Sequence, residues 1–245
     1  MVSRVWLCLL VACGGSSTKP VDAPAEMPVN IPGQPGIGAH GLAFHRLNAN
    51  SSSTISSPAL TTQATGSTMI VSAGRGNRFV FELPTDNKGN APYQLLDTEH
   101  AYTRYPDSGT AVYAFPAMAG GSGHVVRNGT PADDEITLAA VEVINGTRIQ
   151  QVVWSEELQA PLTSKSVTTT GPATLVAFWW GDAGVDSNKT AVPNNGFVVV
   201  DSILQSGALV QCAVAVKNVS AAGTYNVTWT ATPAQGAQLW LVAVQ

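Results

Sequence analysis

The sequence predicts an all-β protein whose body is an antiparallel β-sandwich of the jelly-roll kind, built from two related halves. Three observations lead to this prediction. From about residue 44 onward, short apolar or alternating runs recur between clusters of Gly, Pro, Asn and Asp, as in strands joined by turns. The same stretch carries no amphipathic pattern of helical period and useful length. Similar segments also occur in the same order twice, about 107 residues apart.

The expected strands are runs in which apolar residues are consecutive or alternate with polar ones. Residues 149–154 and 225–229 are the clearest, because Tyr225, Val227 and Trp229 share one face of the second run. The full set comprises residues 68–73, 78–83, 110–115, 124–128, 136–144, 148–154, 174–180, 196–204, 208–216, 223–232 and 238–244.

The internal repeat relates residues 55–147 to residues 160–245. Each segment opens with a Thr-rich strand, containing Thr61-Thr62 in the first and Thr168-Thr169 in the second. A variable middle, a Gly-containing turn, a strand that ends in Thr and a final apolar strand follow in both. A repeat of this length is too long for a solenoid unit. It predicts either two halves of one large sandwich or two small sandwiches packed together.

Composition restricts the partners of this body. Charged residues make up 11% of the chain, hydrophobic residues make up 44%, and the formal net charge is −4. Nucleic-acid binding needs clustered Lys and Arg to neutralise phosphates, so we expect no nucleic-acid partner. The apolar and β-branched content indicates a folded chain and argues against disorder.

The N-terminus has the pattern of an export signal. Arg4 is the only charged residue before an apolar run over residues 5–12, and this run is shorter than the roughly 20 residues of a membrane-spanning helix. The run ends in Leu10-Val11-Ala12-Cys13, which resembles the lipobox of bacterial lipoproteins. The resemblance implies that residues 1–12 are a signal peptide and that the Cys13 thiol carries lipid. Two or three acyl chains would make the attachment to the membrane nearly permanent.

The resemblance also implies an extracytoplasmic location, anchored to the cell envelope. In lipoproteins an Asp after the modified cysteine often retains the protein at the inner membrane. Here that residue is Gly14, which favours the outer membrane where the cell has one. The alternatives are an ordinary secretory signal with a chance cysteine and a cytosolic protein with an apolar start. Residues 13–38 are rich in Pro and Gly, and we expect them to tether the body, residues 39–245.

The first half of the body resembles a β-sandwich segment common in secreted bacterial surface proteins. The resemblance lies in Thr85-Asp86-Asn87-Lys88-Gly89-Asn90 with a tyrosine following at Tyr93, one residue later than usual. It also includes an aromatic strand at residues 112–114 and a loosely matching closing strand at residues 141–146. It implies a sandwich outside the cytoplasm and no particular chemistry.

Two oxygen-rich turns are the candidate metal sites. The first contains Asp86 and Asn90, and the second contains Asp182 and Asp186. Calcium accepts loop oxygens without strict geometry, so a structural calcium ion is the only cofactor considered. Neither turn matches an EF-hand, and ordinary turn composition gives the same residues.

The sequence nominates no catalytic residue. The closest approach to a nucleophile elbow, residues 120–124, has His124 in place of the final Gly and is interpreted as a flexible hairpin loop. Asp97, Glu99 and His100 are interpreted as a solvated strand edge, since adjacent strand positions point to opposite faces. Cys212 lies in an apolar strand pattern and is expected to be a small buried side chain, so the body has no internal disulfide.

Aromatic residues are the candidate ligand contacts. Tyr93, Tyr102 and Tyr105 fall in a long polar segment interpreted as a loop, and adjacent Trp179 and Trp180 should point to opposite faces of a strand, with Trp179 nominated for the ligand surface. A cell-wall or surface glycan would be a suitable partner, although a sandwich also buries many aromatics.

Three functions are therefore kept open. The first is a non-catalytic surface, adhesion or envelope-structural role for a lipid-anchored sandwich. The second is a carbohydrate-binding lipoprotein. The third is a hydrolase whose site is assembled from carboxylates scattered along the sequence.

Overall fold

The computed structural model describes residues 26–48, 52–77, 81–129, 133–183, 189–232 and 236–245. All the regular secondary structure in these ranges is β-strand. The first ten strands are β1 (Gly36–His45), β2 (Thr54–Ser56), β3 (Leu60–Thr61), β4 (Ser67–Arg75), β5 (Thr85–Asp86), β6 (Gln94–Tyr102), β7 (Tyr105–Met118), β8 (Ser122–His124), β9 (Val126–Gly129) and β10 (Ile136–Ile144). The next ten are β11 (Ile149–Glu157), β12 (Leu162–Thr163), β13 (Val167–Thr169), β14 (Ala173–Asp182), β15 (Val192–Pro193), β16 (Val198–Ile203), β17 (Val210–Val219), β18 (Gly223–Tyr225), β19 (Thr228–Thr230) and β20 (Ala237–Val244).

Each strand of the first half has a counterpart ten strands later. The large sheet β1-β10-β4-β7-β6 matches the large sheet β11-β20-β14-β17-β16. The small sheets β2-β9-β5 and β3-β8 match β12-β19-β15 and β13-β18 in the same way. This correspondence confirms the all-β, antiparallel fold made of two related halves. The repeat of strands starts at β1 and β11, ahead of the segments in which the sequence similarity is visible.

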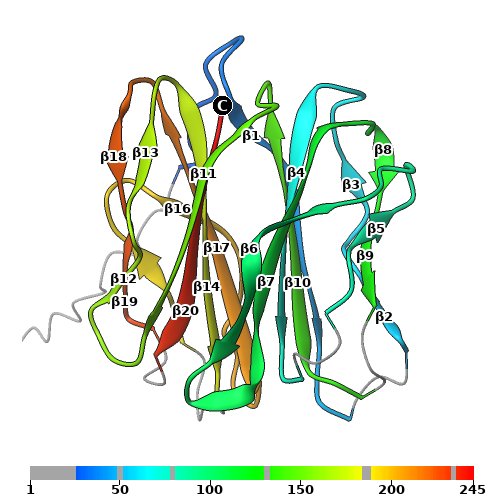
Figure 1. Ribbon diagram of the computed structural model, residues 1–245, viewed down its shortest axis with the longest axis vertical. Coiled ribbons are helices and arrows are strands. Elements are labelled where there is room, and N and C mark those ends of the chain that lie inside the picture. Colours follow the sequence, from blue (N-terminus) through cyan, green and yellow to red (C-terminus); the bar gives the residue numbers. More distant parts are fainter. Residues whose placement is uncertain (1–25, 49–51, 78–80, 130–132, 184–188, 233–235) are drawn as a thin grey trace, which may run out of the picture.

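The sheets form four layers, with the two large sheets in the middle and the small sheets outside (Figure 1). One apolar core lies between the large sheets and joins residues such as Ile70 and Val112 to Phe178 and Val242. Each half also has a core of its own between its large sheet and its small sheets. The molecule is therefore two small sandwiches packed together through their large sheets.

Because each large sheet is covered on both faces, its central strands are buried on both faces along most of their length. Trp179 and Trp180 show the effect, since both are 0% exposed although they point to opposite faces of β14. Trp180 lies in the core between the halves, and Trp179 lies in the core of the second half. The expectation that one of this pair is exposed is therefore wrong.

Two seams run along the edges of the large sheets, where the halves meet. At one seam β1 lies beside β16, and at the other β6 lies beside β11. Since β6 and β16 are counterparts, as are β1 and β11, a pseudo-twofold relationship connects the halves. Between the seams, the buried hydroxyl of Thr110 donates to Gln238 Oε1 at 2.7 Å and accepts from Trp240 Nε1 at 2.7 Å.

Most of the expected strands are present with shifted ends. Residues 124–128 and 223–232 each divide into two short strands, β8 with β9 and β18 with β19. Of the expected strand at 78–83, residues 78–80 lie outside the described residues and residues 81–83 are not in a strand. The edge strands β1 and β6 were not expected from the sequence.

The N-terminal end of the described chain is bound to the body. Asn218 Nδ2 donates to the carbonyl of Val29 at 3.1 Å and to Asn30 Oδ1 at 2.9 Å. Asn30 also bonds both backbone polar groups of Ile37, and β1 begins at Gly36, inside the segment expected to act as a tether. Cys13 and the signal sequence lie outside the described residues.

Candidate functional site

The carboxylate of Asp86 is the centre of a buried hydrogen-bond network in the first half. Its Oδ1 accepts the backbone N–H groups of Lys88 at 2.9 Å and of Asn90 at 3.1 Å. Its Oδ2 accepts Asn90 Nδ2 at 2.7 Å and the Tyr93 hydroxyl at 2.8 Å, and it lies 3.1 Å from His124 Nε2. Every oxygen of this carboxylate is therefore committed to protein donors.

These hydrogen bonds involve both residues that the sequence proposed as calcium ligands in the first oxygen-rich turn. Asn90 also uses its Oδ1, which accepts the backbone N–H of Ala119 at 2.8 Å. Burial raises the pKa of Asp86, but the donors from Asn90, Tyr93 and Lys88 outweigh it and hold the pKa below its usual value. Asp86 and Asn90 therefore close a loop by bonding to each other and to the backbone, and a calcium ion at this turn stays a prediction.

The same network includes a hydroxyl, an imidazole and a carboxylate in sequence. Thr62 Oγ1 lies 3.2 Å from His124 Nδ1, and His124 Nε2 lies 3.1 Å from Asp86 Oδ2. The order resembles that of a nucleophile with its base, but the His124 and Asp86 side chains are 0% exposed. The Thr62 hydroxyl is further held by the N–H and carbonyl of Gly121. Two hydrogen bonds thus join Thr62 to the hairpin at residues 120–124, the last three residues of which form β8.

Two of the nominated residues, Tyr105 and Asp182, come together in a hollow between the halves. We call this the acidic hollow; it consists of two adjoining depressions of about 430 and 450 Å³. Both depressions are lined by Gly76, Asp182 and Leu209. The remaining lining residues include Leu47, Asn48, Asn77, Tyr105, Pro106, Asp107, Ser108, Asp133, Asp134, Glu135, Ala183 and Val210.

Most of the buried carboxylates in the acidic hollow already have structural partners. Asp134 Oδ2 accepts Arg75 Nε at 3.2 Å, and Glu135 Oε1 accepts the backbone N–H of Leu209 at 2.8 Å, which ties the first half to the second. Burial raises the pKa of Asp134, Glu135 and Asp182, and the charge of Asp134 raises that of Asp182 further. Among the described residues, Asp182 forms no ion pair and is hydrogen-bonded to Ser108, so it is the partly buried carboxylate of this hollow that keeps spare acceptor capacity.

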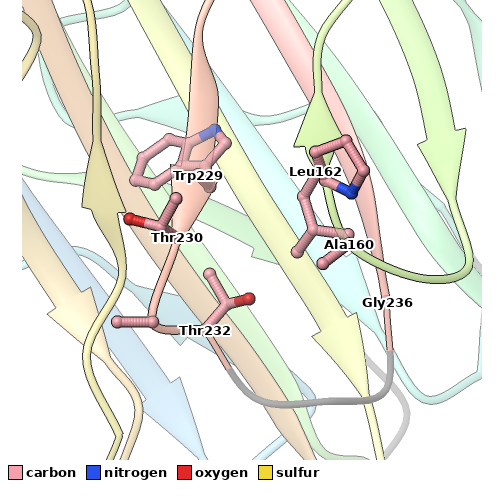
Figure 2. Close-up of a pocket in the computed structure, with 8 residues that line it drawn as sticks. Ala160, Leu162, Trp229, Thr230, Thr232 and Gly236 are labelled. Atoms are coloured by element: carbon pink, nitrogen blue, oxygen red, sulfur yellow. The ribbon is translucent and has the colours of Figure 1, made fainter.

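A third hollow, of about 480 Å³, opens beside the small sheet of the second half (Figure 2). Leu162 of β12 and Trp229 of β19, which are paired in the small sheet, both line it, together with Thr230 and Thr232. Its lining residues carry no acidic or basic side chain, so this hollow offers shape and apolar contact without proton chemistry.

The β6–β11 seam carries a depression of about 520 Å³ that the sequence did not single out. It is lined by Asp97, His100, Val152, Val153, Trp154 and Lys165, and we call it the seam depression. The imidazole of His100 stacks on the indole of Trp154 with 3.8 Å between the centroids and 5° between the planes. A bulge between Leu96 and His100 brings Asp97 Oδ2 to 3.0 Å from His100 Nε2, so these side chains meet although simple alternation would separate them.

The other nominated ligand contacts do not form an exposed aromatic surface. Tyr93 and Tyr102 are 1% and 0% exposed, because the segment interpreted as a loop contains β6 and the start of β7, packed against the core. Burial raises the pKa of Tyr102 to about 12. Trp179 is buried, Tyr105 is exposed, and Asp186 lies outside the described residues.

Comparison with known proteins adds no assignment, since no protein family, curated protein or solved structure matches this chain. Within the described ranges, no group of three or more His, Cys, Asp or Glu side chains is arranged to hold a metal ion. The described part of the chain also has no helix with the length and apolarity needed to cross a membrane.

Proposed function

We propose that this chain is a lipid-anchored extracytoplasmic protein with a non-catalytic role in adhesion or in the structure of the cell envelope. The observation that carries the proposal is the burial of the network formed by Thr62, His124 and Asp86. A hydroxyl, an imidazole and a carboxylate lie in the order of a catalytic triad, in which the imidazole would be the base. The His124 side chain is 0% exposed and Thr62 is 6% exposed, so a substrate has no access to either group.

The acidic hollow supports the same proposal. Glycoside hydrolysis uses two carboxyl groups that flank the scissile bond. Here Asp134 is paired with Arg75 and Glu135 accepts backbone N–H groups, which leaves Asp182 without a second uncommitted buried carboxylate beside it. Asp107 on the same rim is exposed to solvent and forms no ion pair with any of the described residues.

The shape of the body suits a presenting or bridging role. Its two sandwiches share a continuous apolar core, so they form one rigid unit that does not depend on disulfides, and the free thiol of Cys212 is buried. The lipid on the lipobox-like Cys13 would anchor the chain to the membrane, and the Pro- and Gly-rich residues after it would hold the body away from the membrane surface.

The anchor is tested by metabolic labelling of the expressing cells with an alkyne fatty acid. We expect the full-length chain to carry the label and to sediment with membranes, and Cys13→Ala to lose both properties. Label that persists in Cys13→Ala would contradict the lipid assignment.

The non-catalytic role is tested with the detergent-solubilised full-length chain and purified cell envelopes. We expect saturable co-sedimentation, with soluble saccharide and peptide fragments remaining at the level of a blank without protein. Time-dependent release of fragments that disappears in Asp182→Asn would overturn the proposal in favour of a hydrolase. An absence of co-sedimentation would overturn the envelope-binding role.

A further inference from the structure

We infer that the seam depression is a binding site for a neutral glycan of β-linked pyranose rings. Both halves contribute to it, with Asp97 and His100 on β6, Trp154 on β11, and Lys165 between β12 and β13. Its volume of about 520 Å³ falls in the range of about 300–1,000 Å³ that is usual for small-ligand sites. The inference rests on the proposed function only in treating the body as a binding module, and it does not depend on the lipid anchor.

The first element of the site is a rigid aromatic platform. His100 stacks flat on Trp154, and its ring also meets the edge of Trp240 at a centroid distance of 5.2 Å. The half-buried Trp154 is thus fixed on one face and still lines the depression. A rigid aromatic surface offers apolar contact without the entropy cost of ordering a flexible side chain.

The second element is a pair of polar groups beside the platform. The Asp97 side chain is 48% exposed and uses Oδ2 for His100, while Oδ1 makes no hydrogen bond within the described residues. Lys165 is exposed, and its ammonium group has no acidic partner in the described part of the chain. A carboxylate accepts and an ammonium donates, so together they match adjacent sugar hydroxyls, which do both.

The third element is the backbone at Asp97. This residue has φ of 68° inside the bulge of β6, a left-handed conformation that, apart from glycine, Asp and Asn adopt most readily. The conformation allows the carboxylate to reach the ring of His100 three residues later. It thereby orients both the acceptor and the platform.

These elements select the class of ligand. Pyranose rings with equatorial substituents, such as β-linked glucose and N-acetylglucosamine, present a face of axial C–H groups that suits an aromatic surface. The opposite charges of Asp97 and Lys165 leave the depression without a strong net field, which favours a neutral sugar over a uronate or an amine.

The opposite seam provides an internal comparison. There His40 Nδ1 lies 2.8 Å from Asp201 Oδ2, so a His–Asp pair again stands where the halves meet. This pair joins β1 of the first half directly to β16 of the second, and neither side chain lines one of the described hollows. Asp201→Asn is therefore a matched control for Asp97→Asn.

The test is isothermal titration of the full-length chain with cellohexaose and with chitohexaose. We expect saturable binding of at least one of them. Trp154→Ala and Asp97→Asn should each weaken binding by about tenfold or more. A tenfold change corresponds to about 1.4 kcal/mol, which is typical for the loss of one anchoring contact. Lys165→Ala, a change at an exposed side chain that leaves folding intact, should weaken binding severalfold, and Asp201→Asn should leave it unchanged.

Three results would overturn the inference. One is no binding of either oligosaccharide at millimolar concentration. Another is binding that survives both Asp97→Asn and Lys165→Ala, which would place the glycan elsewhere. The third is an equal loss in Asp201→Asn, which would show a general effect on the fold. All three leave the labelling and envelope experiments unaffected, so failure of this site is distinguishable from failure of the proposed function.

Discussion

Ser57 and Ser164 occupy equivalent positions in the two halves and make the same pair of hydrogen bonds. The backbone N–H of Ser57 donates to the carbonyl of Val126 at 2.8 Å, and the Ser57 hydroxyl accepts the N–H of Val126 at 3.1 Å. Ser164 makes both bonds with Val227, at 2.9 and 3.1 Å. The duplication therefore extends from the order of strands to individual polar contacts.

Replacing either serine should cost a similar amount of stability. Ser57→Ala and Ser164→Ala each leave a buried backbone N–H without its acceptor, and we expect the free energy of unfolding to fall by about 1–2 kcal/mol in each variant. Urea denaturation measures the change, with the exposed Ser202→Ala as the control. A large loss in one variant and none in the other would show that the two contacts are not energetically equivalent.

The two covered faces of β14 can be tested separately. Trp179→Ala and Trp180→Ala each remove a fully buried indole from a different core, and each should lower the free energy of unfolding by about 3–5 kcal/mol. The half-exposed Val192→Ala should change it by about 0.5 kcal/mol or less. A small effect at Trp180 alone would mean that the large sheets are not packed together in solution.

Asp86→Asn should destabilise the first half through its loop network. The amide keeps one acceptor oxygen but places N–H groups against the donors of Asn90 and Tyr93, so we expect a loss of about 2–4 kcal/mol at pH 7. The folded pKa of Asp86 is lowered, so its contribution is present above the unfolded pKa of about 3.9 and disappears as the pH falls through the folded value. Thermal melts from pH 7 to pH 2 should therefore show the wild type and Asp86→Asn converging in acid, whereas a constant gap would rule out this account.

Asp182→Asn should stabilise the protein at pH 7, whereas Asp86→Asn should destabilise it. Burial and the charge of Asp134 raise the pKa of Asp182, so ionising this carboxyl opposes folding. The penalty is absent below the unfolded pKa of about 3.9 and grows as the pH rises toward the folded value. We expect Asp182→Asn to melt at a higher temperature than the wild type at pH 7 and at the same temperature near pH 3. A lower melting temperature at pH 7 would show that the hydrogen bond with Ser108 outweighs the effects of burial and of the Asp134 charge.

The central strands were predictable because both of their faces are buried, so their sequences are mostly apolar from end to end. The predicted strand at 136–144 coincides with β10, and 238–244 with β20 but for one residue, since both lie in sheets covered on two faces. β1 and β6 carry Gly, His and acidic residues, as is common at sheet edges, and bulges interrupt their alternation. No local pattern in these two segments distinguishes an edge strand from a loop.

The candidate site was less predictable because its residues meet only through the packing of the halves. Tyr105 and Asp182 were nominated for different reasons, and nothing near either residue indicates that they share a hollow. Asp97 and His100 were set aside on the basis of strand alternation, which the bulge at Asp97 reverses. Trp154 belongs to a clear strand pattern, but its stacking partner comes from the other half, 54 residues earlier in the chain.

The pseudo-twofold arrangement also bears on how the two seams diverged. In a symmetric homodimer, any substitution at one seam would appear at the other, and a hollow would be gained or closed at both together. Joining the halves in one chain removes this constraint. The seam with His40 and Asp201 is joined by a hydrogen bond between the two halves, while its counterpart keeps an open surface around Trp154. In a single chain, one seam can thus secure the assembly while the other remains open at the surface.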